Sequence, residues 1–205
     1  MDRRRFVSTL SGLALGWTLA NLMEVEASAK GPVVVEAGRR VDAPDARDAR
    51  FPASNVDVVR KRIATFFAHE KPSALVCSGA CGADLLALQV AGERHMKRYM
   101  VLGAEPAEFR KSSVTDRPGN WGELFDQAIK ASKVEVLKLP DGQEGYLETN
   151  LKLLDRAQAV AKQSGTTVVA LVIWNEQSRG SDDVTNHFLQ QAELRKIPVT
   201  EISTL

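Results

Sequence analysis

The sequence predicts an α/β fold, a Rossmann-like three-layer α/β/α sandwich built on a mostly parallel sheet. Short apolar runs rich in Val, Leu and Ile alternate along the chain with amphipathic segments. The apolar runs are nearly continuous, as expected of strands that are buried on both faces. The chain has 205 residues, of which 44% are hydrophobic and 26% charged, and this size and composition suit one globular domain.

The expected strands and helices alternate from residue 33 to residue 202. Helices are expected where apolar residues recur every three or four positions, as at Val59, Ile63 and Phe67. Strands are expected at the short apolar runs, of which 166–174 is the strongest. The expected strands are 33–35, 74–77, 98–102, 134–139, 166–174 and 199–202, and the expected helices are 55–69, 85–91, 121–131, 148–163 and 183–196.

Composition excludes several classes of function. Lys and Arg number 27 and Asp and Glu 26, so the basic excess of a typical nucleic-acid-binding domain is missing. Two cysteines are too few for a disulfide scaffold or a four-cysteine zinc site. The three histidines are far apart and lack metal-ligand spacing. We therefore expect no nucleic-acid partner, no metal and no cofactor.

The first 29 residues have the layout of a twin-arginine signal peptide. Arg3 and Arg4 precede an uncharged run from Phe6 to Met23, and the small residues Ala27 and Ala29 follow it. The run contains many Ser, Thr and Gly residues, so it is too polar for a typical membrane span. We therefore expect a signal peptide at 1–29, a mature domain at 30–205, a periplasmic or exported location and no stable membrane anchor.

Two alternatives to the signal peptide remain open. Residues 1–29 could form an amphipathic helix that packs on the domain of a cytoplasmic protein, or an anchor that is never cleaved.

The segment 78–84, Ser-Gly-Ala-Cys-Gly-Ala-Asp, follows an expected strand and opens an expected helix. Ligands of parallel sheets bind at the carboxyl ends of the strands, so this segment is a candidate site. Its glycines and the free N–H groups at the start of the helix favour binding of an anion, and the hydroxyl of Ser78 is a further donor. Asp84 could accept hydrogen bonds from a ribose. The alternative is a tight turn in which Asp84 only caps the helix.

The loop after the first strand begins with Gly38 and Arg39. The guanidinium of an arginine binds phosphate and carboxylate groups through two parallel hydrogen bonds, so these two residues are candidates for ligand binding. Arg47 and Arg50 are interspersed with aspartates, and we interpret them as part of a solvated loop.

Together these segments resemble the nucleotide-sensing domains of the SLOG superfamily, especially its bacterial branch. The superfamily also includes the Lonely-guy phosphoribohydrolases and the DNA-processing protein. The resemblance covers about residues 33–204 and is carried by Gly38–Pro44, by the 78–84 motif and by the strand ending in Trp174 and Asn175. It implies a Rossmann-like fold that binds a nucleotide or a nucleotide-derived ligand. The implied ligand-binding residues are Gly38, Arg39, Ser78, Gly79, Gly82, Asp84 and Thr185.

The sequence departs from the superfamily's pattern at two places. Thr185 is retained after the last long strand, but Asp182 and Asp183 bring negative charge to the segment where a second phosphate loop is expected. The Pro-Gly-Gly-x-Gly-Thr-x-x-Glu signature, which supplies the catalytic glutamate of the Lonely-guy enzymes, is absent. The pattern therefore favours binding or sensing of a nucleotide over hydrolysis.

Two other hypotheses remain open. The first is an N-glycosidic hydrolase acting on nucleotides; its catalytic residues are unknown, and Asp84 is the best candidate. The second is a non-catalytic interaction domain that has lost its ligand, with Asp182 or Asp183 turned toward Arg39. A homo-oligomer is compatible with each hypothesis.

Replacing Arg3 and Arg4 by Lys should trap the precursor in the cytoplasm, because export by the twin-arginine route depends on the arginine pair. In unmodified cells, fractionation and N-terminal sequencing should find a mature periplasmic species that begins at residue 30. Full-length protein confined to the cytosol of unmodified cells would contradict the signal peptide.

Overall fold

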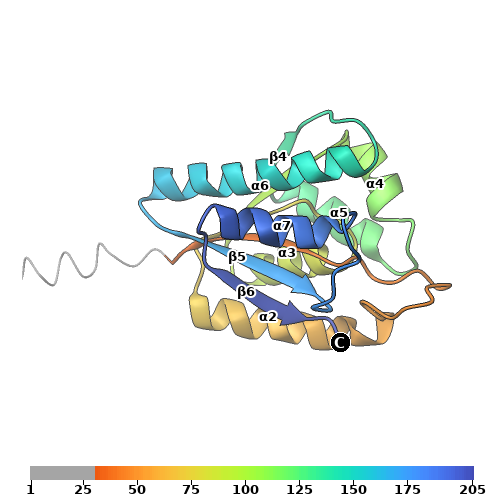
Figure 1. Ribbon diagram of the computed structural model, residues 1–205. Helices are drawn as coiled ribbons and strands as arrows, with labels where there is room; N and C mark the ends of the chain where they lie inside the picture. Colours follow the sequence, from red (N-terminus) through yellow and green to blue (C-terminus); the bar gives the residue numbers. More distant parts are fainter. Residues whose placement is uncertain (1–30) are drawn as a thin grey trace, which may run out of the picture. The chain divides into compact units, whose positions relative to one another are not determined.

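Six parallel strands form one sheet in the computed structural model, which describes residues 31–205 (Figure 1). Their order is β4-β3-β2-β1-β5-β6, and all neighbouring pairs are parallel. The strands are β1 (Val33–Gly38), β2 (Ala74–Cys77), β3 (Lys97–Leu102), β4 (Lys133–Val136), β5 (Val168–Trp174) and β6 (Val199–Ser203).

Helices cover both faces of this sheet, so its central strands are buried on both sides (Figure 1). Helices α2, α3, α4 and α5 pack with one core cluster and α6 and α7 with the other. The helices are η1 (Ala53–Asn55, a 3-10 turn), α2 (Val56–Glu70), α3 (Ala83–Glu93), α4 (Pro106–Ser113), α5 (Trp121–Lys130), α6 (Gln143–Ser164) and α7 (Val184–Leu194).

The order of the strands creates a switch point between β1 and β5. From β1 the chain adds β2, β3 and β4 in one direction, then crosses back to add β5 and β6 on the other side. The loops that follow β1 and β5 therefore diverge at the carboxyl edge, where open α/β sheets bind ligands. Gly38, the last residue of β1, pairs with Ile173 near the end of β5, so both loops start at the same level.

The predicted three-layer α/β/α fold is confirmed; the differences are one additional helix, α4, and the ends of several elements. Helix α4 was not expected, since Phe109 and Ser113 are its only buried residues and give no apolar periodicity. Helix α6 begins five residues before the expected 148, because its first turn is largely exposed and polar. The strand expected at 134–139 ends at Val136, although the N–H of Leu137 still donates to Leu102.

The signal peptide and the domain boundary at residue 30 lie outside the described residues, and both stay predictions. Residues 31–205 form one compact unit. Within that range, no helix has the length and apolar content that crossing a membrane requires.

Two glycines allow α3 to approach the loop after β1. A Cβ on Gly82 would lie 2.7 Å from the backbone N of Val41 and 2.8 Å from the carbonyl O of Arg39. A Cβ on Gly38 would lie 2.4 Å from the Cβ of Ala83. Such distances leave no room for a side chain. The start of α3 is therefore held directly against the backbone of residues 38–41.

Gly82→Ala should destabilise the protein by about 1–3 kcal/mol more than Gly142→Ala, because only Gly82 is crowded by backbone atoms. The two glycines make a matched pair: each precedes a helix with φ near +100°, and no atom lies within 4 Å of a Cβ on Gly142. Urea denaturation of both variants measures the difference. Equal losses of stability would show that the close approach of α3 is not a constraint.

Candidate functional site

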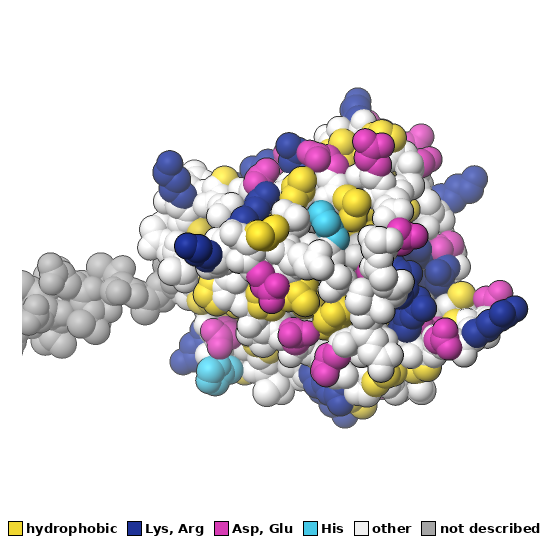
Figure 2. All heavy atoms as spheres, viewed as in Figure 1, with side chains coloured by type: hydrophobic (Ala, Val, Ile, Leu, Met, Phe, Trp, Pro, Cys, Tyr) yellow, Lys and Arg dark blue, Asp and Glu magenta, His cyan; other side chains and the backbone are white. Residues whose placement is uncertain are grey.

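A cavity of about 650 Å³ opens at the carboxyl edge of the sheet. Its walls come from the loops after all of the strands β1 to β5, from α4 and the segment after it, from the first half of α6, and from the starts of α3 and α7. Six arginines line it: Arg39, Arg40, Arg47, Arg50, Arg117 and Arg179. Its carboxylates are those of Asp42, Asp48, Asp84, Asp141 and Asp182. Figure 2 shows basic side chains gathered on the right of the molecule, beside the loop that follows β1.

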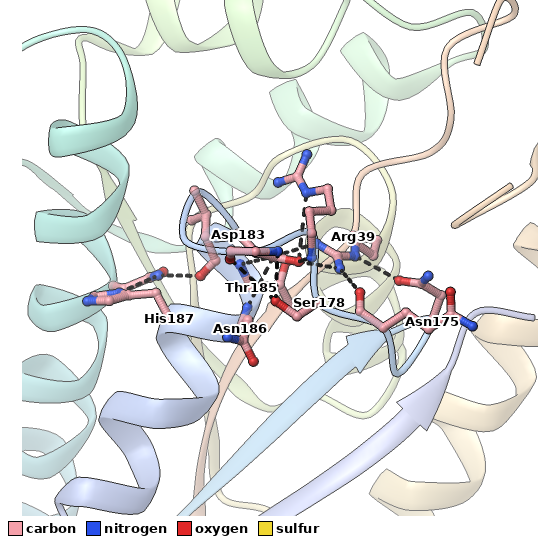
Figure 3. A network of polar contacts seen from close by, with 12 residues as sticks. Arg39, Asn175, Ser178, Asp183, Thr185, Asn186 and His187 are labelled. Atoms are coloured by element: carbon pink, nitrogen blue, oxygen red, sulfur yellow. Dashed lines mark hydrogen bonds and ion pairs between the residues drawn. The ribbon is translucent and has the colours of Figure 1, made fainter. Parts of the chain in front are cut away.

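Arg39 is buried at the switch point and is engaged by the loop after β5 (Figure 3). Its guanidinium donates two parallel hydrogen bonds to the carboxylate of Asp183, at 2.6 and 2.7 Å. It also donates to Oδ1 of Asn175 at 3.1 Å and to the carbonyl O of Gln177 at 2.8 Å. These bonds use most of the donors of the side chain. The guanidinium of Arg39, which the sequence predicts to bind a ligand, is thus bound to a carboxylate of the protein itself.

Asp183 also begins α7. Its Oδ1 accepts hydrogen bonds from the N–H groups of Thr185 and Asn186, and its Oδ2 accepts one from the N–H of Arg179. Burial alone would raise the pKa of Asp183, but the hydrogen bonds from Arg39 and from these backbone groups outweigh burial and lower the pKa to about 2. Asp183 is therefore ionised at every physiological pH.

The other cavity arginines differ in how they are neutralised. Arg40 and Arg117 both form ion pairs with Asp116. Arg179 lies 3.7 Å from Asp183, whose carboxylate Arg39 already holds. Among the described residues, no carboxylate lies within ion-pair distance of Arg47 or Arg50.

Positive charge accumulates around Arg179. Burial lowers the pKa of Arg179, and the positive charges of Arg39 and Arg50 lower it further, against the opposing effects of Asp183 and Asp182. Guanidinium groups from the loops after β1 and β5 are therefore close enough to influence one another.

The 78–84 loop is closed by its own aspartate. Oδ2 of Asp84 accepts hydrogen bonds from the N–H of Gly79 at 2.9 Å and from the N–H of Ala80 at 3.2 Å. The N–H of Cys81 donates to the carbonyl of Ser113, and that of Ala83 donates to Arg39. Most N–H groups expected to point at an anion therefore have internal partners.

Glu36 is an unexpected buried acid on β1. Its side chain is fully buried, and within residues 31–205 neither carboxylate oxygen has a hydrogen-bond partner. Burial raises the pKa of Glu36 well above its usual value, and the nearby charge of Asp84 raises it further. The protonated form of Glu36 therefore persists to a higher pH than that of an exposed glutamate.

The structure brings five of the predicted site residues to the cavity: Gly38, Arg39, Ser78, Asp84 and Thr185 all line it. Gly79 and Gly82 do not line it; they shape the loop and let α3 approach. The role of all seven in binding a ligand stays a prediction. Asp183 is turned toward Arg39, the arrangement expected for an interaction domain that has lost its ligand.

Sequence reasoning assigned Arg47 and Arg50 to a solvated loop, and both line the cavity. It also missed Arg179 and Tyr146, which come from distant parts of the chain. A signal existed for Arg179, since it lies in the loop after the strongest strand. None existed for Tyr146, because the first turn of α6 was not expected.

Comparison with known proteins identifies neither a family model nor a curated sequence that matches the chain. Solved structures of similar fold include DNA processing protein A from Streptococcus pneumoniae (17% identity, 83% of this chain and 59% of that chain, TM-score 0.41). A second is DNA processing protein A from Helicobacter pylori (13% identity, 86% of this chain and 77% of that chain, TM-score 0.41). A third is the molybdenum cofactor binding protein from Rippkaea orientalis (12% identity, 86% of this chain and 93% of that chain, TM-score 0.36). At these identities and TM-scores, the similarity concerns the fold alone.

The expectation of no nucleic-acid partner is contradicted by these comparisons. The Helicobacter pylori structure is described as showing a mode of single-stranded DNA binding. The expectation rested on the net charge of +1, which sums over the whole chain, whereas phosphate contacts depend on local charge. Six arginines line one cavity, so guanidinium groups gather locally although the charge of the chain sums to +1.

Arg39→Ala should destabilise the protein by about 3–5 kcal/mol, because it leaves the carboxylate of Asp183 buried without its cation. Arg60→Ala is the control: it removes an exposed arginine paired with Glu93 and should cost less than about 1 kcal/mol. Urea denaturation measures both.

The effect of Arg39→Ala should also depend on pH. A carboxyl with a lowered pKa contributes stability that is present above about pH 4 and is lost as the pH falls toward 2. The stability difference between wild type and Arg39→Ala should therefore narrow in that range. A difference below 1 kcal/mol at pH 7 would show that the ion pair does not hold the two loops.

Proposed function

We propose that this protein binds a small anionic ligand of nucleotide type in the cavity at the carboxyl edge of its sheet. The observation that carries the proposal is the convergence of Arg47, Arg50 and Arg179 on this cavity. Within residues 31–205, Arg47 and Arg50 have no ion-pair partner, and the carboxylate beside Arg179 is already held by Arg39. An anion placed between these guanidinium groups would relieve their repulsion and accept paired hydrogen bonds. Arg39 supports the site by holding the loop that carries Arg179.

The remaining walls suit the uncharged part of such a ligand. Leu139, Pro140 and Leu153 provide apolar surface, and Tyr146 is 45% exposed. An aromatic ring exposed at a cavity offers a face on which a planar base can stack. The volume of about 650 Å³ lies within the range of sites for small molecules.

The hydrolase remains the second candidate, because Asp84 lines the cavity and burial raises its pKa to about 6, although the N–H groups of Ala80 and Gly79 lower it. A pKa in this range suits a general acid or base. The carboxylate of Asp84 is, however, committed to the backbone of its own loop. Binding therefore agrees better with the geometry than cleavage of an N-glycosidic bond does.

The proposal is tested by calorimetry of the full chain against a panel of nucleoside mono- and diphosphates, cyclic nucleotides and a single-stranded oligonucleotide. Arg50→Ala should weaken binding of the best nucleotide by about 10- to 100-fold, because a hydrogen bond to a charged group contributes about 1.5–3 kcal/mol. Arg195→Ala is the matched control, since it removes one positive charge from an exposed ion pair with Asp155.

Binding of no nucleotide by the folded wild-type protein would refute the proposal. Binding of the oligonucleotide alone would replace the ligand class by single-stranded nucleic acid. Release of free base from a nucleoside monophosphate, abolished by Asp84→Asn, would establish the hydrolase instead.

A further inference from the structure

Asp84 brings negative charge to a cavity whose other features favour an anion. The residue lines the cavity but is 6% exposed, and its carboxylate holds the N–H groups of Gly79 and Ala80. A phosphate or carboxylate of a ligand would meet a like charge at this point. It would also find these two N–H groups engaged by a carboxylate of the protein itself.

Charged and titratable groups from two strands and one loop lie near Asp84. Glu36 on β1 and Cys77 on β2 are completely buried and interact with it electrostatically. Arg39 and Arg40, in the loop against which α3 begins, line the same cavity and are paired with Asp183 and Asp116. Burial raises the pKa of the Cys77 thiol well above its usual value, and the charges of Asp84 and Glu36 raise it further. For Glu36 and Cys77, burial therefore extends the pH range in which the proton is retained.

The other elements that pack against α3 contribute apolar side chains to the same core. Helix α2 contributes Ile63, β3 contributes Met100 and α5 contributes Phe125. Burial raises the pKa of Asp84 to about 6, against the N–H groups of Ala80 and Gly79.

We propose that the anionic ligand binds together with one proton, which Asp84 takes up from the solvent. This inference rests on the proposed function of the same cavity. The proton adds to a carboxylate oxygen of Asp84, and no covalent bond of the ligand forms or breaks. The neutral carboxyl no longer repels the ligand, and it holds the N–H groups of Gly79 and Ala80 less strongly, so that they can donate to the anion.

The coupling fixes the direction of the pH dependence. Below about pH 6, Asp84 of the free protein already carries the proton, so affinity is nearly constant. Above it, the proton must be taken up on binding, and affinity falls by up to tenfold per pH unit. For complete uptake, the ligand should bind about 25-fold more tightly at pH 5.5 than at pH 7.5.

The test is calorimetry of the full chain with adenosine 5′-monophosphate and 3′,5′-cyclic AMP. Each titration is run at pH 5.5, 6.5 and 7.5, in two buffers with different heats of ionisation, so that the protons taken up per ligand are counted. The charge of cyclic AMP is constant in this range, whereas a phosphomonoester titrates near pH 6. For the monophosphate, the number of protons taken up on binding by wild type is therefore compared with the number taken up by Asp84→Asn.

On binding cyclic AMP at pH 7.5, the wild-type protein should take up close to one proton from the solvent. The Asp84→Asn variant should take up none, and its affinity for cyclic AMP should be the same at all three pH values. Asp57→Asn removes an exposed carboxylate of α2, outside the cavity, and should keep the proton uptake. Binding with equal proton uptake in wild type and Asp84→Asn would overturn this inference and leave the proposed function intact. Absence of binding at every pH would overturn both.

A second measurement uses the wild-type protein alone, should Asp84→Asn fail to fold. The carboxyl carbon of Asp84 is titrated by NMR with and without saturating nucleotide. Its pKa should rise by more than one unit in the complex. An unchanged pKa in the presence of bound nucleotide would overturn the inference.

Discussion

The ion pair between Arg39 and Asp183 is the interaction on which the geometry of the site depends. It joins residues 144 positions apart, one directly after β1 and one at the start of α7. Since the switch point lies between β1 and β5, the two loops would otherwise diverge. Removing both charged groups from water costs several kcal/mol, and the pair is viable because Asn175, Gln177 and the backbone of α7 satisfy the remaining hydrogen-bonding groups.

The ion pair also affects Arg179, which lines the cavity. Asp183 is the carboxylate nearest to Arg179, and its two oxygens already accept hydrogen bonds from Arg39 and the backbone. The charges of Arg39 and Arg50 act on Arg179 from the loop after β1. An internal acid at the position of the expected phosphate loop thus holds Arg39 and leaves Arg179 on the cavity wall.

The fold and the location of the site follow from local sequence. Buried apolar runs predict parallel strands, and in such a sheet the carboxyl ends meet at one edge, so residues as distant as Gly38, Ser78 and Thr185 could be expected to line one cavity. Local patterns do not determine which partner a side chain selects. Whether Arg39 faces a ligand or Asp183 depends on the path of a loop 144 residues away. The burial of Glu36 was not predicted, because one acidic residue does not change the apolar pattern by which the strand is recognised.

The two carboxylates at the site illustrate how burial produces opposite outcomes. Burial disfavours the charge of Asp84 and of Asp183 alike, but Asp183 has a guanidinium beside it and Asp84 has only backbone N–H groups. Asp183 is therefore ionised at physiological pH and holds the loop after β5 to Arg39. The pKa of Asp84 is close enough to neutral pH that both of its protonation states are accessible. Such a group responds to a new charge in the cavity at low energetic cost. In a cavity rich in arginine, the carboxyl of Asp84 is accordingly the element that a bound anion would change first.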